Sequence, residues 1–226
     1  LEQKGKHDML EKVVNIHPPH VRIYYTRQGQ PLGLGHAVNC AAGIVGDEPC
    51  AVLLPDDIIF SETEVPLAEM VKVYEETGQS VVMVEEVPSE KTKNYGIIDL
   101  GGNGVANRRA SVKGMVEKPQ PEDAPSNLGV VGRYILTPKH FDYLAQGNIG
   151  AGGEIQLTDA MNEVAKQEGY QAYVLEGERF DCGDKVGFQM ANLFFAMRND
   201  YTSDKLLPYL LKIAAQYERR ADIRVA

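Results

Sequence analysis

Cys50–Asp57, with the sequence CAVLLPDD, is the stretch that decides the fold. Small and apolar residues fill it as far as Leu54, which predicts a fully buried strand. Asp56 and Asp57 follow at the carboxyl end of that strand, where open α/β sheets bind their ligands. A carboxylate in that place can hold a divalent metal against a phosphate. The stretch alone is equally typical of a strand that ends in a solvated Asp-Asp turn. The choice between a metal site and such a turn therefore depends on the rest of the sequence.

Composition and charge describe a globular protein that can still bind a small polyanion. Of the 226 residues, 43% are hydrophobic and 24% are charged, which is ordinary for such a protein. The apolar runs are far shorter than the roughly 18 residues of a membrane span. A formal net charge of −9 argues against nucleic-acid binding through a basic face. Cys40, Cys50 and Cys182 are widely spaced, which predicts neither a disulfide framework nor a zinc site and fits a reducing cytoplasm.

Strands and helices alternate in the first part of the chain. Strands are expected at 21–27, 50–54 and 80–84, with helices at 36–45 and 66–76 between them. This order is typical of parallel βαβ units with right-handed crossovers. The pattern predicts the α/β class, with a doubly wound, mixed and mostly parallel sheet.

The second part departs from this alternation. Short strands at 95–100 and 114–116 flank a loop rich in Gly, Asn and Arg, which predicts a small β excursion. Further elements are expected as strands at 127–136 and 170–175 and as helices at 138–145, 154–167, 184–197 and 204–219. We therefore predict a domain over 1–200 and a C-terminal helical tail over 201–226.

A Gly-rich turn joins the strand at 21–27 to the helix at 36–45. Gln28 in this turn carries an amide that both donates and accepts, which suits the edge of a base. Glycines such as Gly33 let the backbone approach a ligand, and the helix N-terminus offers free N–H groups. An ordinary turn, in which the glycines serve geometry alone, is the alternative.

Charged residues also stand at the ends of other elements. Lys118 can neutralise a phosphate and Glu117 can accept hydrogen bonds from sugar hydroxyls, unless both form a solvated pair before a turn. Asp184 is an N-cap candidate, but capping does not explain Asp181, which is a candidate second metal ligand. Glu154 is expected in the first turn of its helix, where the dipole favours an acid.

Taken in order, these motifs resemble the bacterial UTP–glucose-1-phosphate uridylyltransferases, within the sugar-nucleotide nucleotidyltransferases. The resemblance runs over nearly the whole chain, to about Met197. It is carried by RQ at 27–28, PLGLGHA at 31–37, LPDD at 54–57, YG at 95–96, VEKP at 116–119, NLGVVGRY at 127–134, EIQLTDA at 154–160 and DCG at 181–183. It implies a Rossmann-like nucleotidyltransferase fold.

The resemblance also implies a reaction and residue roles. UTP and glucose 1-phosphate would give UDP-glucose and pyrophosphate, by in-line attack of a sugar-phosphate oxygen on the α-phosphorus. The implied protein is a homodimer or homotetramer. The implied roles are uracil contacts for Gln28 and Gly33, Mg²⁺ binding for Asp56 and Asp181, a glucose pocket lined by Gly96, Glu117 and Gly132, a sugar-phosphate contact for Lys118, and less defined substrate contacts for Asp57, Val131 and Glu154.

Two departures from the family pattern matter. Gly129 stands where the family commonly has Ala, near the sugar pocket. The family's Gly-rich loop, with an Arg and a Lys that bind the triphosphate, has no counterpart in this sequence, so we expect a chain truncated at its N-terminus. Two alternatives therefore stay open: a non-catalytic fragment that binds UDP-glucose or only oligomerises, and a relative that uses another sugar phosphate or nucleotide.

Overall fold

The computed structural model describes residues 2–225, with the side chains of residues 2–217. Contacts within the chain divide it into two compact units, Leu1–Pro31 and Leu32–Ala226. The domain boundary predicted near residue 200 is a different division of the chain and stays a prediction.

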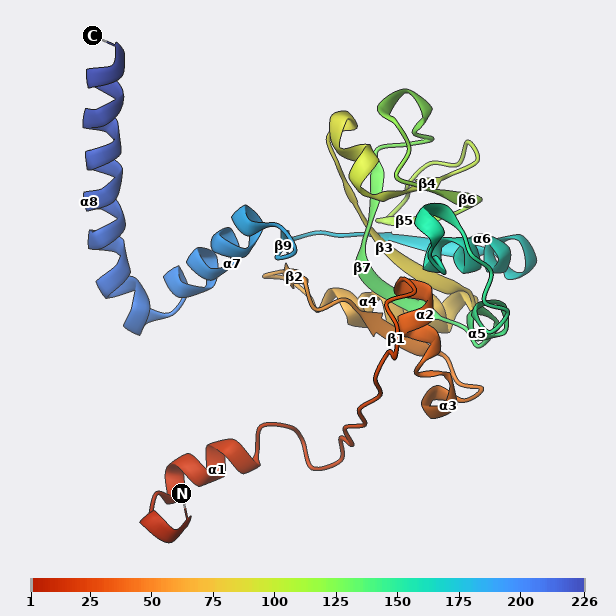
Figure 1. Ribbon diagram of the computed structural model, residues 1–226, viewed down its shortest axis with the longest axis horizontal. Coiled ribbons are helices and arrows are strands. Elements are labelled where there is room, and N and C mark those ends of the chain that lie inside the picture. The colour runs from red at the N-terminus through yellow and green to blue at the C-terminus, as the bar shows by residue number, and fades with distance from the viewer. Residues whose placement is uncertain (1, 226) are drawn as a thin grey trace. The chain divides into compact units, whose positions relative to one another are not determined.

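The first unit has little regular structure. It holds a 3₁₀ turn, Glu2–Lys4, and helix α1, His7–Val14 (Figure 1). The strand predicted at 21–27 is wrong. In the described part of this unit there is no second strand to supply the backbone hydrogen bonds that a strand needs.

The second unit is built around a mixed sheet that has seven strands in the described residues. The strand order is β5-β8-β3-β7-β4-β6, and β1 also pairs with β7. The strands are β1 (Cys50–Leu53), β3 (Ser80–Glu86), β4 (Gly96–Asp99), β5 (Arg109–Ser111), β6 (Gly114–Glu117), β7 (Leu128–Leu136) and β8 (Tyr170–Val174). β3 and β8 are parallel, whereas β7 is antiparallel to β1, β3 and β4. The predicted α/β class and mixed sheet are confirmed, and β4 with β6 forms the predicted β excursion. The sheet is not mostly parallel as predicted, because β3 with β8 is the one parallel pair among the described strands.

β7 is the central strand because it has partners along both edges. β3 lies along one edge. Along the other edge, β1 pairs with Arg133–Leu136 and β4 pairs at Gly129. The neighbouring strand therefore changes from β4 to β1 around Val130–Gly132. Such a change of neighbour leaves room beside the central strand, which is where α/β sheets place ligands.

β1 is less buried than its apolar sequence predicts. Half-buried and exposed residues alternate along it, and Leu53 keeps 51% of its surface exposed. The prediction of a fully buried strand is wrong because β1 pairs with β7 alone among the described strands and so lies at an edge.

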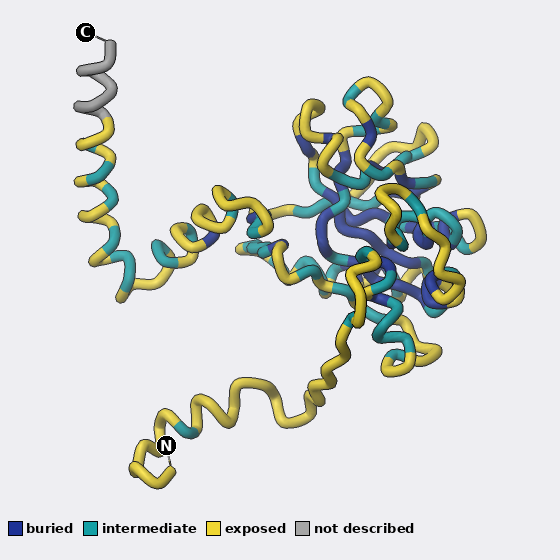
Figure 2. Tube along the Cα trace, viewed as in Figure 1, coloured by how far each residue is buried: buried dark blue, intermediate teal, exposed yellow. Residues whose placement is uncertain are grey.

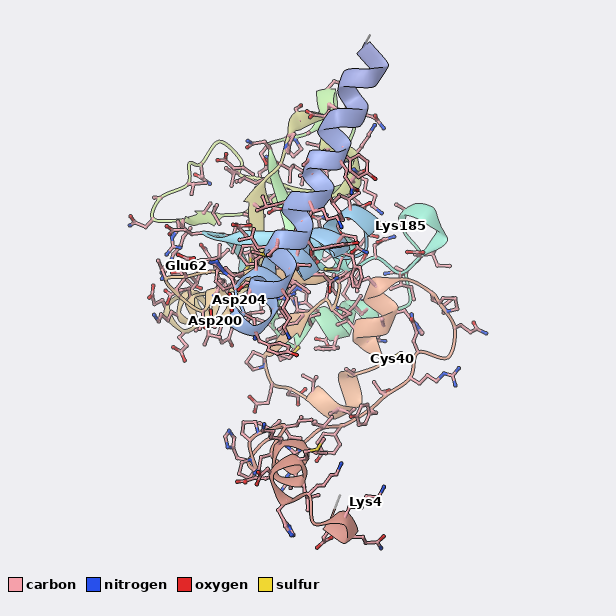
Figure 3. All side chains as sticks on the ribbon, turned by 90° about the vertical axis from the view of Figure 1, so that its left-hand side faces the viewer. Lys4, Cys40, Glu62, Lys185, Asp200 and Asp204 are labelled. Atoms are coloured by element: carbon pink, nitrogen blue, oxygen red, sulfur yellow. The ribbon has the colours of Figure 1, made fainter. Side chains whose placement is uncertain are left out.

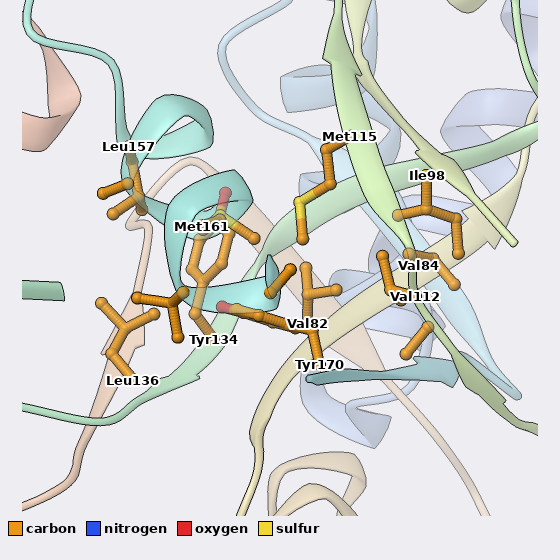
Figure 4. Close-up of a cluster of buried hydrophobic side chains, with 14 of the residues drawn as sticks. Val82, Val84, Ile98, Val112, Met115, Tyr134, Leu136, Leu157, Met161 and Tyr170 are labelled. Atoms are coloured by element: carbon orange, nitrogen blue, oxygen red, sulfur yellow. The ribbon is translucent and has the colours of Figure 1, made fainter. Parts of the chain in front are cut away.

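Helices cover both faces of the sheet, as expected for a doubly wound fold. Alternate residues of β3 serve two separate cores, with Val82 and Val84 in one and Val81 and Met83 in the other. The first core, shown in Figure 4, also receives side chains of α2 (Leu34–Asn39), α3 (Ala42–Val45), α5 (Lys139–Leu144) and α6 (Leu157–Glu168). Helix α4 (Pro66–Thr77) covers the second core. Figure 2 shows the buried residues gathered on the central strands.

The remaining elements include a second, small sheet that the sequence did not predict. β2 (Asp57–Phe60) pairs antiparallel with β9 (Glu178–Asp181), with Asp57 directly opposite Asp181. Short 3₁₀ turns lie at Ser89–Asn94, Pro121–Asp123 and Ala151–Gly153.

Two helices follow the small sheet. α7 (Lys185–Met197) begins after Asp184, whose carboxylate accepts hydrogen bonds from the amides of Val186 and Gly187, so the predicted N-cap is confirmed. α8 (Asp200–Val225) starts earlier than predicted, with Asp200 and Asp204 near its beginning (Figure 3). In the described chain, no helix combines the length and the apolar character needed to cross a membrane.

His140 is a fully buried titratable residue of α5 that contacts Tyr170 of β8. Its Nδ1 lies 3.1 Å from the Thr137 carbonyl oxygen and its Nε2 lies 3.3 Å from the Tyr170 hydroxyl. Burial lowers the pKa of His140 to about 4, although the Thr137 carbonyl and the charge of Glu168 partly oppose this shift. The folded protein therefore keeps this ring neutral in mildly acidic solution.

This burial predicts a specific pH dependence of stability. Above about pH 6.5 the ring is neutral in both the folded and the unfolded protein. Between about pH 6.5 and pH 4 the unfolded chain binds a proton at this ring, whereas the folded protein does not. The free energy of unfolding should fall across that window by on the order of 3 kcal/mol from this group. His140→Gln should flatten this part of the curve in urea titrations, while His20→Gln, at an exposed position, should not. Parallel curves for the wild type and His140→Gln would refute the assignment.

Candidate active site

A pocket with a volume of about 230 Å³ opens where the neighbour of β7 changes from β4 to β1. The Leu54 amide donates to the Gly132 carbonyl, 2.9 Å away, and so fixes the end of β1 beside β7. The lining includes the predicted site residues Asp56, Asp57, Gly96, Glu117, Gly132 and Asp181. It also includes Asn94, Tyr95, Thr158 and Arg179, which the sequence did not single out.

Asp56 and Asp181 lie together although 125 positions separate them in the sequence. The pairing of β2 with β9 brings them close, and the Cys182 amide donates to the Asp56 carbonyl at 2.7 Å. Both carboxylates face Gly183. A Cβ atom at Gly183 would stand 3.1 Å from Asp181 Oδ1 and 3.3 Å from Asp56 Oδ2. The missing side chain of Gly183 therefore leaves a cradle between two carboxylates.

This donor set fits a hard divalent cation. Mg²⁺ prefers oxygen ligands and is commonly held by one or two carboxylates, with waters and phosphate oxygens completing its shell. Among the described residues, no group of three or more His, Cys, Asp or Glu side chains could hold a metal. The pair of Asp56 and Asp181 thus suits a metal that shares its coordination with a ligand, rather than one enclosed by protein.

Asp57 has a different environment from its neighbour Asp56. Asp57 is buried, and both of its carboxylate oxygens accept hydrogen bonds from other residues of the protein. Oδ2 accepts from the Gly132 amide at 2.8 Å, and Oδ1 accepts from Arg179 Nε at 2.5 Å. Arg133 also donates to the Asp57 carbonyl, 2.6 Å away. The Asp57 side chain therefore joins β2 to β7 and to Arg179 on β9.

Arg179 is the buried cation of this pocket. Its side chain is 7% exposed, and besides Asp57 it donates to Glu85 at 2.6 Å and to the Tyr95 hydroxyl at 3.4 Å. Burial alone lowers the pKa of Arg179, but the Tyr95 hydroxyl and the charges of Asp57 and Glu85 reverse this, so its pKa is raised overall. The guanidinium therefore stays charged. Nothing in the local sequence distinguishes this arginine from an exposed one.

The other side of the pocket is formed by β4, β6 and α6. Gly96 lies opposite Glu117 in the ladder, and a Cβ at Gly96 would come 3.3 Å from Glu117 Oε2. The Thr158 hydroxyl donates to the same oxygen at 2.7 Å and orients it. Lys118 has a left-handed backbone conformation with a φ of 48°. Its side chain is exposed, and its ammonium nitrogen lies 3.8 Å from Glu117 Oε1.

Of the remaining predicted residues, Gly33, Val131 and Glu154 are not part of the pocket lining. Gly33 has a φ of 105°, and a Cβ there would stand 2.7 Å from Glu154 Cβ, so the Gly-rich turn packs against this segment. Glu154 itself is exposed and precedes α6, which begins at Leu157; the predicted start of that helix at Glu154 is wrong because Gln156 occupies the N-cap. The Val131 side chain is buried in the core under α4. Gln28 belongs to the first unit, so its role in the pocket stays a prediction.

Comparison with known proteins places this chain among nucleotidyl transferases. The family profile described as Nucleotidyl transferase matches residues 1–197. The UTP–glucose-1-phosphate uridylyltransferase of Bacillus subtilis (strain 168) is 48% identical over 211 residues, which are 93% of this chain and 70% of that protein. The enzyme of that name from Staphylococcus haemolyticus is 46% identical over 94% of this chain and 73% of its own length.

Solved structures agree with the sequence comparisons. A UDP-glucose pyrophosphorylase from Acinetobacter baumannii superposes with a TM-score of 0.83 at 37% identity, covering 94% of this chain and 73% of that one. A UTP-bound UGPase from the same organism gives a TM-score of 0.82, also at 37% identity, over 93% and 73% of the two chains. The similarity therefore extends to the fold of almost the whole described chain.

The contact between Gly132 and Asp57 yields a direct test. A Cβ at Gly132 would overlap Asp57 Oδ2 and stand 2.7 Å from Leu54 Cβ. Gly132→Ala should lower the free energy of unfolding by about 1–3 kcal/mol, as overpacking does in cores, in urea denaturation. Gly104→Ala is the matched control, since Gly104 has ordinary backbone angles and nothing within 4 Å of its added Cβ. Equal unfolding midpoints for the two variants would contradict the close approach.

Proposed function

Because this chain belongs to the UTP–glucose-1-phosphate uridylyltransferase family of nucleotidyl transferases, we propose that it transfers the uridylyl group of UTP to glucose 1-phosphate. The products are UDP-glucose and pyrophosphate. The observation that supports this most is a single pocket with a carboxylate pair on one side and an oriented glutamate on the other. A carboxylate pair can hold a metal ion against a nucleotide phosphate, and a glutamate can accept hydrogen bonds from sugar hydroxyls.

We propose Mg²⁺ as the metal, held by Asp56 and Asp181. When bound, it would neutralise phosphate charge in the transition state. The Gly183 cradle supports this assignment, because a larger residue would bring carbon into contact with both carboxylates. The Asp57 carboxylate keeps β2 and β9 beside β7 and so holds Asp56 and Asp181 within reach of the pocket.

Glu117 is proposed to accept hydrogen bonds from hydroxyl groups of glucose. The Thr158 hydroxyl fixes the orientation of its carboxylate, and the absent side chain of Gly96 leaves space next to it. Gly132 keeps β7 free of a side chain at the centre of the pocket. Lys118, which is exposed beside Glu117, would oppose the repulsion between two anionic substrates.

Gln28 and Gly33 are proposed to contact the uracil. Glu154 packs against Gly33 and so would support the Gly-rich turn. Val131 would contribute through its backbone, since its side chain is buried elsewhere. The attacking sugar phosphate is already an anion, so the reaction requires no strong general base. These residues would act by positioning the substrates and by neutralising charge.

Location and assembly are further parts of the proposal. Cys50 and Cys182 are free thiols, which supports a cytoplasmic protein. Apolar side chains are exposed on α7 and α8, among them Phe188, Leu193 and Leu211, which supports a homodimer or homotetramer. A uridylyltransferase assay and calorimetry with UDP-glucose on this chain would separate catalysis from binding alone.

The metal assignment predicts a large kinetic effect at Asp56. Asp56→Ala should lower the turnover number by about a hundredfold or more, because charge stabilisation in the transition state is lost. Pyrophosphate release at saturating substrates measures this, and circular dichroism should show that the variant remains folded. Asp142→Ala removes an exposed carboxylate on α5 and should behave as wild type. A near-normal turnover number for Asp56→Ala with Mg²⁺ would overturn the metal role.

The uracil assignment predicts a change of specificity at Gln28. Gln28→Ala should reduce the preference for UTP over CTP by about tenfold, because a hydrogen bond to the uracil edge is lost and cytosine presents a different pattern of donors and acceptors there. The Michaelis constant for glucose 1-phosphate should stay near its wild-type value. Gln30→Ala, in the same turn, serves as the control. An unchanged ratio of kcat/KM for UTP and CTP in Gln28→Ala would rule out this contact.

A further inference from the structure

We propose that Arg179 is a positioning residue that couples the metal-binding and sugar-binding sides of the pocket. The role rests on the proposed function. Arg179 lies on β9, two residues before Asp181, and its guanidinium contacts groups from separate parts of the fold. Those groups are Asp57 on β2, Glu85 at the end of β3, Tyr95 before β4, and Asp181 on β9 itself.

Each nitrogen of the guanidinium has a separate partner. Nε binds Asp57 at 2.5 Å, Nη1 binds Glu85 at 2.6 Å, and Nη2 lies 3.8 Å from Asp181 Oδ2. Only arginine offers a planar fork of donors that can serve such spread partners. A lysine at this position would keep the charge but supply one nitrogen. The side chain geometry, and not charge alone, is therefore required for these contacts.

On the metal side, Arg179 limits how Asp181 can turn. Asp181 Oδ1 accepts from the Gly183 amide at 3.0 Å, and Arg179 stands near Oδ2. The Asp181 side chain is 43% exposed, and among the described residues Arg179 is the only lysine or arginine within 4 Å of its carboxylate. Arg179 and the Gly183 amide thus hold this carboxylate toward Asp56. Partners of metal-binding carboxylates of this kind commonly affect metal affinity.

On the sugar-binding side, Arg179 contacts Tyr95, and Tyr95 in turn is linked to Gly96 and Lys118. The guanidinium carbon lies 5.3 Å from the centre of the Tyr95 ring, and Nη1 lies 3.4 Å from its hydroxyl. The Tyr95 carbonyl accepts from the Lys118 amide at 2.9 Å, and Gly96 is its chain neighbour. The position of Tyr95 therefore affects the backbone at Gly96, which lies opposite Glu117, and the backbone amide of Lys118.

Charge balance gives Arg179 its importance within the pocket. Among the described residues that line it, Arg179 is the only lysine or arginine, while Asp56, Asp57, Glu117 and Asp181 are carboxylates. Arg133 lies nearby, but its guanidinium donates to backbone carbonyls of Leu54, Gly132 and Asp57. Two anionic substrates enter this acidic pocket in the proposed reaction. Arg179 offsets part of the negative charge of the pocket and so reduces the repulsion that they meet.

The test compares Arg179→Lys with wild type in two binding experiments. Mn²⁺ binding to the protein saturated with UDP-glucose is followed by electron paramagnetic resonance, and UDP-glucose binding without metal is followed by calorimetry. We expect Arg179→Lys to weaken Mn²⁺ binding by about tenfold or more, because the metal-binding carboxylate of Asp181 loses its contact with the guanidinium. UDP-glucose binding should weaken as well, because Tyr95 loses its support. Arg109→Lys, at a surface pair with Glu76, should leave both dissociation constants unchanged.

A second variant keeps the test decisive if Arg179→Lys fails to fold. Tyr95→Phe removes only the hydroxyl that Arg179 contacts, and it should weaken UDP-glucose binding while sparing Mn²⁺ binding. The proposal is overturned if the folded Arg179→Lys protein binds both ligands as wild type does, or if Tyr95→Phe leaves UDP-glucose binding unchanged. Wild-type protein that neither binds UDP-glucose nor transfers uridylyl groups would overturn the proposed function, and this role with it.

Discussion

The hydrogen bond from the Gly132 amide to the buried Asp57 carboxylate is the contact on which the site depends. It joins β7, the central strand of the large sheet, to β2, the first strand of the small sheet. A buried carboxylate is costly unless its charge is compensated, and Arg179 on β9 supplies that compensation. One side chain therefore connects two sheets, and the pocket forms along this connection.

The same contact separates the roles of two adjacent aspartates. Asp56 lies in the turn after β1, whereas Asp57 is the first residue of β2, so the two side chains have different environments. Asp57 turns inward to Gly132 and Arg179, whereas Asp56 faces Gly183 together with Asp181. A structural carboxylate and one that is open to a ligand thus arise from neighbouring positions. Glycine makes both arrangements possible, since side chains at Gly132 or Gly183 would meet carboxylate oxygens.

Local signals in the sequence predicted several elements well. Pro66 begins α4 and Gly78 ends it in the left-handed conformation, as their residue types indicate. The apolar run of β3 and the N-cap at Asp184 were predicted for equally local reasons. The strand at 21–27 and the full burial of β1 were predicted wrongly, because both depend on neighbouring strands and not on the residues themselves. β2 and β9 were missed because each is short and their pairing spans more than a hundred residues.

By itself, the sequence determined the α/β class, the family to which the chain is similar, and the carboxylates Asp56, Glu117 and Asp181 as candidates. These follow from residue types in a fixed order, which local chemistry can interpret. Only the tertiary structure decided that Asp57 is enclosed, that Arg179 is buried among carboxylates, and that Thr158 orients Glu117. The reason is physical: burial and charge pairing depend on which distant strands lie side by side, and in this protein that is set by the pairing of Asp57 with Asp181 across β2 and β9.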